Sequence, residues 1–344
     1  MIKKLLYASA IVALSACTGT EKQSTEYNVS VNSDQEASLV FLTNFDTGEK
    51  IDSAAVVDGV ATFKGNIDKP VWARIITNGK RGGMFILEAD SITVFNRDSI
   101  VGGELNGRLD AISKQFNKIT EEYESINDSI RDNFSEIYSA KLDSVQEVAM
   151  NENIDNPIGY YFFLQKAYDM NLDDFNKAVN NTPSLGEYQR IKELKTAKIN
   201  KEETGEGKMF KDFVVPSDSA EAFRLSDVVG KGQYVLVDFW ASWCGPCIRE
   251  TALIKDIYKE YAPKGLKVLG VAVWDEPENT LNAIETHELP WQNVLNAQKI
   301  PTDIYGISGI PCIILFGPDG TIIARDKYDD DLRKAVADAF NNKD

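Results

Sequence analysis

Two cysteines separated by a Gly-Pro pair form the most reactive pattern in this sequence. Cys244 and Cys247 lie in the segment DFWASWCGPCIRE, residues 238–250. The attacking species in disulfide exchange is a thiolate, so a redox cysteine needs a lowered thiol pKa and an accessible sulfur. The spacing therefore predicts either a working dithiol–disulfide pair or a simple closed loop, and the neighbouring elements favour the first.

The pair lies between a predicted strand and a predicted helix. YVLVDF, before it, is typical of a buried strand, and IRETALIKDIYKEYA, after it, has helical spacing. Unpaired backbone N–H groups and the positive end of the dipole at a helix N-terminus stabilise a thiolate, and Pro246 suits the first turn. We therefore predict that Cys244 is the nucleophile and that Cys247, one turn further on, is the resolving thiol.

The surrounding segments predict an α/β module. LKVLGVAV is typical of a second buried strand, CIILF and TIIA flank a GPDG turn, and a final helix is expected from about Asp331 to Phe340. Helix, parallel strand and hairpin alternate, which predicts a mixed sheet flanked by helices.

The C-terminal part also resembles a known superfamily. VDFWASWCGPC, followed by YGISGIPCIILF and GPDG, is similar to the thioredoxin superfamily over residues 207–344. The segments GKMFKDF and KGLKVLGVAVWDE, with the extra stretch at 274–296, resemble the TlpA-like membrane-anchored thiol-disulfide oxidoreductases. The resemblance implies a thioredoxin fold and redox activity that needs no cofactor beyond the cysteine pair.

The resemblance also implies a substrate-binding surface. It places a cis proline at Pro311, facing the cysteine pair, with the backbone of Ile310 offered to a substrate strand. Trp243, Gly245 and Pro246 are expected to form the rest of that surface. Trp240 is expected in the apolar rim or in the core.

An acid near the cysteines is implied as well. Asp238 matches the buried acid that exchanges a proton with the resolving cysteine, a task that suits a carboxyl whose pKa burial has raised. Two alternatives stay open: Asp238 is an ordinary hydrogen-bonded residue at a strand end, or an acid of the extra segment, Asp275 or Glu276, takes the role.

Cys312 stands where the superfamily usually has a threonine or another small polar residue. One interpretation is a small buried hydrophobic residue, which free cysteine resembles. The other is a third redox thiol close to Cys244.

The first residues indicate export. Lys3 and Lys4 precede an apolar run, and residues 1–17 have the order of a signal peptide. The ending Leu14-Ser15-Ala16-Cys17 resembles the bacterial lipobox, which implies cleavage before Cys17 and lipid attachment to it. The alternatives are a simple secretory peptide or a membrane-spanning anchor, for which the run is short of the required ~20 residues. Residues 18–26 are polar and are expected to form a tether.

Between the tether and the redox module we expect two regions. Short β-branched runs cut by turn residues predict a small antiparallel β domain over 27–105, which resembles an uncharacterised domain of envelope lipoproteins. A helical region is expected over 106–200, with one long amphipathic helix from Leu109 through Ile137 and a second helix opened by Pro157. This region is interpreted as packing against its neighbours, with partner binding as the alternative. The polar stretch 198–208 is the predicted domain boundary.

Composition excludes several functions. The net charge of −16 disfavours binding to nucleic acid. His287 is the single histidine, one C-x-x-C is a poor zinc site, and the chain has no phosphate-binding glycine fingerprint.

We therefore predict a lipid-anchored thiol-disulfide oxidoreductase on the periplasmic side of a bacterial membrane. It is expected to reduce disulfides of exported proteins and to receive electrons from a separate transmembrane donor. The alternatives are a disulfide oxidase or isomerase, a thiol peroxidase, and a non-enzymatic binding lipoprotein whose C-x-x-C is a structural disulfide.

Overall fold

A computed structural model describes residues 25–33, 37–96, 99–216 and 221–341. The chain divides into two compact units, residues 1–138 and 139–344. No helix in these described ranges is long and apolar enough to cross a membrane.

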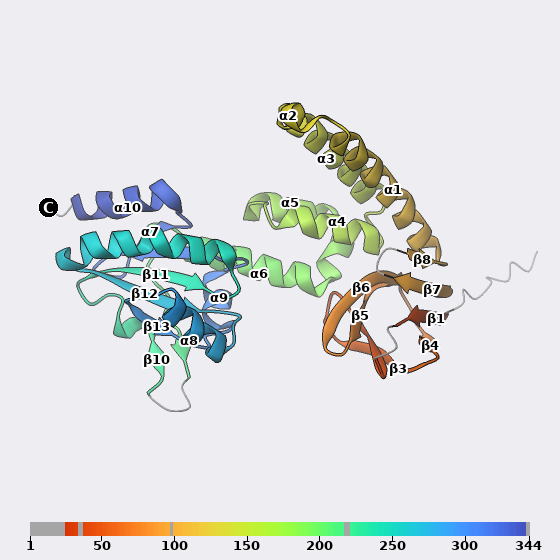
Figure 1. Cartoon of the computed structure of the whole chain (residues 1–344), viewed down its shortest axis with the longest axis horizontal. Helices are drawn as coiled ribbons and strands as arrows, with labels where there is room; N and C mark the ends of the chain where they lie inside the picture. The colour runs from red at the N-terminus through yellow and green to blue at the C-terminus, as the bar shows by residue number, and fades with distance from the viewer. Residues whose placement is uncertain (1–24, 34–36, 97–98, 217–220, 342–344) are drawn as a thin grey trace, which may run out of the picture. The chain divides into compact units, whose positions relative to one another are not determined.

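The first unit is built on one mostly antiparallel sheet. In its described residues the strand order is β6-β5-β2-β3-β4-β1-β7-β8 (Figure 1). The strands are β1 (Glu26–Asn32), β2 (Leu39–Asn44), β3 (Lys50–Val57), β4 (Val60–Asn66), β5 (Val71–Thr77), β6 (Lys80–Leu87), β7 (Ser91–Asn96) and β8 (Ser99–Val101).

Alternating side chains give this sheet its core. In β1, Tyr27, Val29 and Val31 are buried while their neighbours are exposed or partly exposed, which is the period-two pattern of a half-buried strand. They pack with Phe63 and Phe85 in one apolar cluster. The β domain is confirmed, with one departure from the antiparallel expectation: β1 and β7 pair in parallel.

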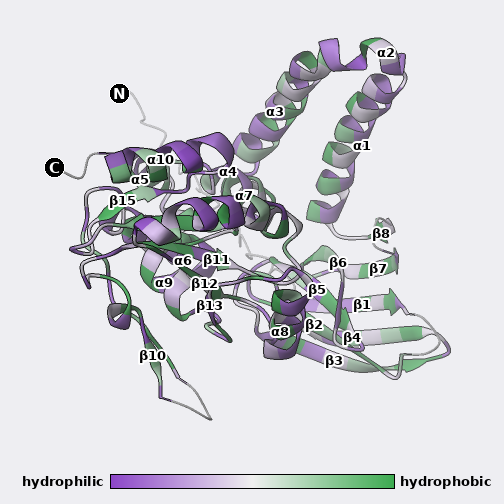
Figure 2. Ribbon diagram, turned by 60° about the vertical axis from the view of Figure 1, so that its left-hand side comes forward, coloured by the Kyte–Doolittle hydropathy of each residue, from purple (hydrophilic) through white to green (hydrophobic). Residues whose placement is uncertain are grey.

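The predicted long helix is interrupted. It is replaced by α1 (Glu104–Glu124), the short α2 (Asp128–Arg131) and α3 (Ser135–Glu152). Ser125 Oγ donates to the Glu122 carbonyl at 2.7 Å, and the Asn127 side chain accepts from the Ser129 N–H at 3.0 Å. Such side-chain bonds compete with the helix, so the prediction of a continuous helix was wrong here. Along α1, hydrophobic and hydrophilic residues alternate (Figure 2).

The second unit begins with helices that lead to the redox module. They are α3 from residue 139 onward, α4 (Pro157–Ala167), α5 (Leu172–Asn181) and α6 (Gln189–Glu203). Pro157 occupies the first turn of α4, and the Asn156 side chain accepts from the Ile158 N–H at 2.9 Å, which is an N-cap. Helix α6 extends into the stretch 198–208, where the sequence predicted a boundary.

The C-terminal sheet has the order β13-β12-β11-β14-β15. The first three strands are parallel, β14 is antiparallel to β11, and β15 is antiparallel to β14. The elements are β11 (Tyr234–Trp240), β12 (Leu266–Ala272), β13 (Gln292–Val294), β14 (Cys312–Phe316), β15 (Ile322–Arg325), α7 (Gly245–Tyr261), α8 (Pro277–Thr286), α9 (Ile300–Tyr305) and α10 (Asp329–Asn341), with a small hairpin of β9 (Val214–Val215) and β10 (Phe223–Arg224).

Both faces of this sheet are covered. Ile254 of α7 and Val336 of α10 pack in one apolar cluster, and Figure 1 shows these two helices on the same side of the sheet. Tyr305 of α9 packs with Phe213 and Phe239 in the cluster on the other face. All seven residues of β11 are buried, as a central strand requires. The predicted thioredoxin-like fold is confirmed.

Candidate redox site

Strand β11 and helix α7 position the cysteine pair. The three residues 241–243 connect them, and Cys244 is the N-cap of α7. Cys244 and Cys247 form a disulfide with their Cα atoms 5.2 Å apart. The backbone N–H of Cys247 donates to Cys244 Sγ at 3.2 Å. An unpaired N–H of the first helical turn is thus aimed at the sulfur that would carry negative charge in the reduced protein.

The surface around the pair is accessible. Cys244 is 4% exposed and Cys247 is fully buried, whereas Gly245 and Pro246 are exposed. Trp243 is 60% exposed, and its indole N–H donates to the Trp274 carbonyl at 3.0 Å. Exposed residues therefore flank Cys244 on both sides, whereas Cys247 faces the interior. The role of Cys244 as the nucleophile stays a prediction. Of the two tryptophans before the motif, Trp240 lies in the core.

The Ile310–Pro311 peptide bond is cis, and it lies next to the pair. The Ile310 carbonyl oxygen is 3.8 Å from Cys244 Sγ. On the other side of the bond, the Tyr328 hydroxyl donates to the Pro311 carbonyl at 2.8 Å. The loop before β14 thus brings backbone groups to the reacting sulfur.

Asp238 is a buried acid on β11, six residues before Cys244. It is 1% exposed, and among the described residues its Oδ1 has no hydrogen-bond partner. Burial raises the pKa of Asp238 to about 8, and the nearby Glu250 carboxyl contributes to the rise. A carboxyl whose pKa is raised this far is able both to give and to take a proton near neutral pH.

Glu250 is a second acid of the site that the sequence reasoning missed. It follows Cys247 by three residues on α7, is 8% exposed, and accepts from the Asp329 N–H at 3.1 Å. Burial raises its pKa, and the Asp329 N–H partly offsets that rise. The available signal was the spacing, because positions three apart on a helix lie on one face and Cys247 faces the interior.

The acids of the extra segment lie elsewhere in the site. Both Asp275 oxygens accept hydrogen bonds: Oδ2 from the Ser242 N–H at 2.7 Å, and Oδ1 from the Ser242 hydroxyl at 2.9 Å. The Thr280 hydroxyl adds a third at 2.8 Å. Asp275 therefore fixes the connection that leads to Cys244. Glu276 is exposed and precedes α8.

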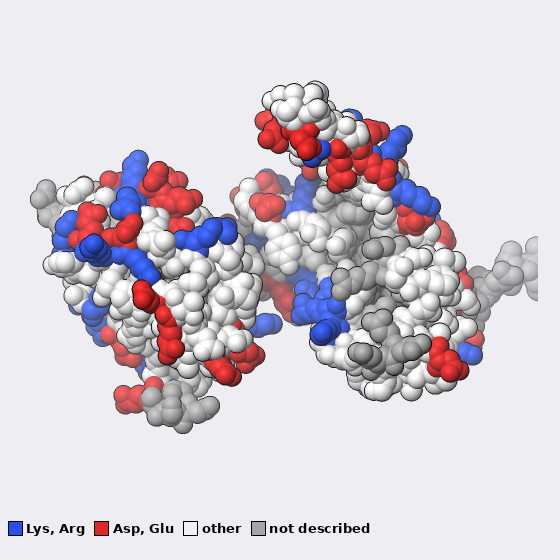
Figure 3. Space-filling view, viewed as in Figure 1, with Lys and Arg blue, Asp and Glu red and all other residues white. Residues whose placement is uncertain are grey.

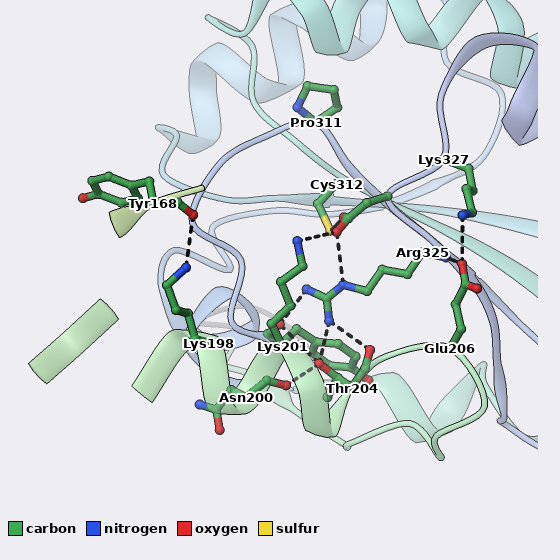
Figure 4. A network of polar contacts seen from close by, with 12 residues as sticks. Tyr168, Lys198, Asn200, Lys201, Thr204, Glu206, Pro311, Cys312, Arg325 and Lys327 are labelled. Atoms are coloured by element: carbon green, nitrogen blue, oxygen red, sulfur yellow. Dashed lines mark hydrogen bonds and ion pairs between the residues drawn. The ribbon is translucent and has the colours of Figure 1, made fainter. Parts of the chain in front are cut away.

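Cys312 opens β14 directly after the cis proline and is buried. Its thiol donates to Asp326 Oδ1 at 3.2 Å. Burial raises the pKa of the Cys312 thiol well above its usual range, and the Asp326 carboxylate adds to this. Burial alone would raise the pKa of Asp326. The hydrogen bond and charge of Lys201, together with the charge of Arg325 and the hydrogen bond from Cys312, outweigh it and hold that pKa below its usual value. Figure 4 shows this cluster.

Other predicted features lie outside this site. In the described part of the chain no group of three or more His, Cys, Asp or Glu residues is arranged to hold a metal ion. His287 follows α8, and its carbonyl accepts from Lys255. Cys17, the signal peptide at 1–17 and the tether up to residue 24 lie outside the described residues.

Two family profiles match the chain. The AhpC/TSA family matches residues 207–325, which contain the redox site. A domain of unknown function, DUF4369, matches residues 27–107, the β domain of the first unit.

Individual relatives match the C-terminal part. The chain is 28% identical over 123 residues to the thiol-disulfide oxidoreductase ResA of Bacillus subtilis, covering 36% of this chain and 68% of that protein. It is 31% identical over 111 residues to ResA of Geobacillus thermodenitrificans, covering 32% of this chain and 63% of that protein. A solved thioredoxin domain of a thiol-disulfide oxidoreductase from Bacteroides vulgatus is 32% identical, with 39% of this chain and 96% of that chain covered and a TM-score of 0.35. The names of the relatives confirm the predicted enzyme class.

Proposed function

We propose that the protein reduces disulfide bonds of exported proteins through the Cys244/Cys247 dithiol. One observation carries the proposal: the pair spans the N-terminus of α7, with Cys244 Sγ 3.8 Å from the carbonyl oxygen of Ile310 in the cis Ile310–Pro311 bond. The buried acid Asp238 lies on β11, six residues before Cys244. This arrangement supplies a stabilised thiolate, a backbone edge for a polypeptide and a proton carrier.

The first half of the reaction forms a mixed disulfide. Reduced Cys244, as the thiolate, attacks one sulfur of the substrate disulfide. The substrate S–S bond breaks, a Cys244–substrate S–S bond forms, and the departing substrate thiolate takes a proton from solvent. The Cys247 N–H, 3.2 Å from Cys244 Sγ in the oxidised protein, is placed to stabilise the attacking thiolate.

The second half releases the substrate. Ionised Asp238 takes the proton of the Cys247 thiol, and the resulting thiolate attacks Cys244 Sγ. The mixed disulfide breaks, the Cys244–Cys247 bond forms, and the second substrate sulfur leaves as a thiolate that recovers the proton from Asp238. Burial, with a smaller contribution from the charge of Glu250, disfavours ionisation of Asp238 and so raises the pH at which this transfer begins.

The proposal includes the direction of electron flow and the location of the protein in the cell. The Gly-Pro pair between the cysteines is the dipeptide of reducing thioredoxins, which favours a reductase. Lipid attachment at Cys17 would tether the protein to the periplasmic side of a bacterial membrane. A transmembrane dithiol donor would return two electrons to the Cys244–Cys247 disulfide after each cycle.

Insulin reduction by dithiothreitol tests the activity. We expect the protein to accelerate precipitation of the insulin B chain, and Cys244→Ala to abolish the acceleration. Cys247→Ala is expected to accumulate a disulfide-linked adduct with substrate, because the resolving thiol is absent. Cys312→Ala is the matched control and should keep the kcat for insulin, because the third thiol takes no part in the exchange. Any effect of losing the Cys312–Asp326 contact should appear in the KM.

Three outcomes would contradict the proposal. A wild type that fails to accelerate insulin reduction lacks reductase activity. A large loss of stability in Cys244→Ala/Cys247→Ala, with no activity in the wild type, indicates a structural disulfide. Rapid turnover of hydrogen peroxide indicates a peroxidase.

A further inference from the structure

Helix α6 packs closely against the end of α9, where the chain turns toward the cis proline. Helix α9 ends at Tyr305, and Gly306 follows with φ 59°. A Cβ at Gly306 would lie 2.0 Å from the Ala197 carbonyl oxygen and 2.6 Å from the backbone nitrogen of Lys201. The Asn200 side chain also donates to the Asp303 carbonyl at 2.7 Å. The start of the segment 306–311 is therefore held against α6.

A buried arginine joins the ends of both helices to β15. The Arg325 side chain is 5% exposed. Its Nη1 donates to the Thr204 carbonyl at 2.9 Å and to the Thr204 hydroxyl, and its Nη2 donates to the Tyr305 carbonyl at 2.7 Å. Thr204 caps the C-terminus of α6 and Tyr305 ends α9, so one cation serves the negative ends of two helix dipoles.

Asp326, the residue that follows β15, extends this connection to the cis proline. Lys201 Nζ of α6 lies 2.8 Å from Asp326 Oδ2, and Asp326 Oδ1 accepts from the Cys312 thiol at 3.2 Å. In Figure 4, Cys312 lies between Pro311 and the Lys201–Arg325 contacts. Helix α6 thus reaches, through two side chains, the residue bonded to Pro311.

We propose that α6 is a positioning element for the cis-proline loop, residues 306–311, and that Lys201 acts as a positioning residue for protein substrates through Asp326. This inference rests on the proposed function and deepens it. The loop is fixed at its start by Gly306 against α6 and at its end by the Lys201–Asp326–Cys312 contacts. Its backbone groups at Ile310 are thereby held beside Cys244.

The same contacts place α6 beside the path of a polypeptide substrate. Two hollows, of about 330 and 580 Å³, adjoin the loop, and Lys201, Gly306 and Ser308 line both. The smaller hollow is also lined by Pro311, and the larger one is also lined by residues of the turn between α4 and α5. A polypeptide that extends from the Cys244 mixed disulfide past Ile310 would contact these lining residues, whereas a small disulfide would not.

The test compares a polypeptide disulfide with a small one. Lys201→Met in the full-length chain removes the ion pair while leaving Gly306 and Arg325 in place. We expect the KM for insulin to rise about fivefold, the effect of losing one partly exposed ion pair. The kcat for insulin and the rate with 5,5′-dithiobis(2-nitrobenzoic acid) should stay within twofold of wild type. Lys201→Arg should restore the KM.

Matched variants isolate the mechanism. Lys195→Met removes another exposed lysine of α6 and should leave the KM unchanged. In a double-mutant cycle, Lys201→Met with Asp326→Asn should raise the KM no further than either change alone, because both break the same contact.

Two results would overturn the positioning role. One is an insulin KM of Lys201→Met equal to that of Lys195→Met. The other is an equal loss with the small disulfide, which would indicate general damage to the site. Either leaves wild-type insulin reduction intact, whereas failure of the proposed function removes that reduction in the wild type itself.

Discussion

Asp238 links the chemistry of the site to the stability of the fold. Its pKa is about 8 in the folded protein, against 3.8 for the ordinary carboxyl. Between these values the folded state holds a proton that the unfolded state releases. Stability is therefore greatest below pH 4 as far as this group is concerned, and it falls as the pH rises toward 8.

We predict that Asp238→Asn removes this pH dependence. The amide keeps the size of the carboxyl and does not ionise. The variant should gain stability relative to wild type by about 1.4 kcal/mol for each pH unit between pH 5 and 7. Urea unfolding of the oxidised proteins at pH 5, 6 and 7 measures the difference. A gap that stays constant across these pH values would show that Asp238 is not the buried proton carrier described above.

The three cysteines of the redox module should differ in reactivity. Cys244 is the N-cap of α7 and is followed by the exposed Gly245 and Pro246, although its own side chain is 4% exposed. Cys247 is fully buried, and burial raises the pKa of Cys312. Iodoacetamide should therefore alkylate Cys244 first in the reduced, folded protein, and peptide mass mapping identifies the site. Labelling after denaturation is the control, in which all three react. Early labelling of Cys312 would support the alternative of a third redox thiol.

The residues of the site differ in how readily the sequence reveals them. The C-x-x-C pair was apparent because spacing and flanking elements determine its chemistry locally. Glu250 was not, because an acid within a charged helix resembles an ordinary surface residue until the neighbouring elements are known. The partners of Cys312 also depend on distant segments, since Lys201 and Asp326 are 125 positions apart in the chain.

At the scale of elements, the contact between α6 and the end of α9 depends on one glycine. Gly306→Ala would place a methyl group 2.0 Å from the Ala197 carbonyl oxygen at a positive φ. We expect a loss of about 3 kcal/mol in the free energy of unfolding, from backbone strain and displacement of α6. Denaturant unfolding followed by circular dichroism measures it.

Gly309→Ala is the matched control, because a Cβ there meets nothing within 4 Å. Its stability should remain within about 0.5 kcal/mol of wild type. Equal stabilities for the two variants would show that α6 does not pack against Gly306 as described.

The main elements of the redox module followed from the sequence, since β11 is a continuous apolar run that is buried along its whole length and α7 has one apolar face. The short elements β9, β10, β13 and α9 were not predicted. The break after α1 was not predicted from the sequence. The apolar spacing continues through it, but Ile130 and Ile137 are 46% and 54% exposed, so no core selects a continuous helix there. Local side-chain bonds at Ser125 and Asn127 then determine where the helix ends.

At the scale of the whole molecule, the net charge bears on how the protein is attached to a membrane. The net charge is −16, and Figure 3 shows many acidic side chains, with some basic ones among them, over the helices α1 to α3. An acidic protein has no electrostatic attraction to an anionic membrane surface, so the proposed attachment depends on lipid at Cys17. The C-x-x-C chemistry was predictable from a few residues, whereas the division into two units depends on contacts between distant segments.

Cys17→Ser tests the anchor. Each buried methylene of an acyl chain contributes about 0.8 kcal/mol to membrane binding, and stable attachment needs more than one chain. In a bacterial expression host the wild type should sediment with membranes, and the variant should appear in the soluble periplasmic fraction. Equal distribution of the two proteins would contradict lipid anchoring.

The equilibrium reduction potential of the Cys244–Cys247 pair, measured against glutathione, tests the proposed direction of electron flow most directly. A protein-disulfide reductase requires a pair closer to thioredoxin, at about −270 mV, than to the oxidant DsbA, at about −120 mV. We predict a potential below about −220 mV, in the reducing range. A value near −120 mV would contradict it and assign the pair to disulfide formation.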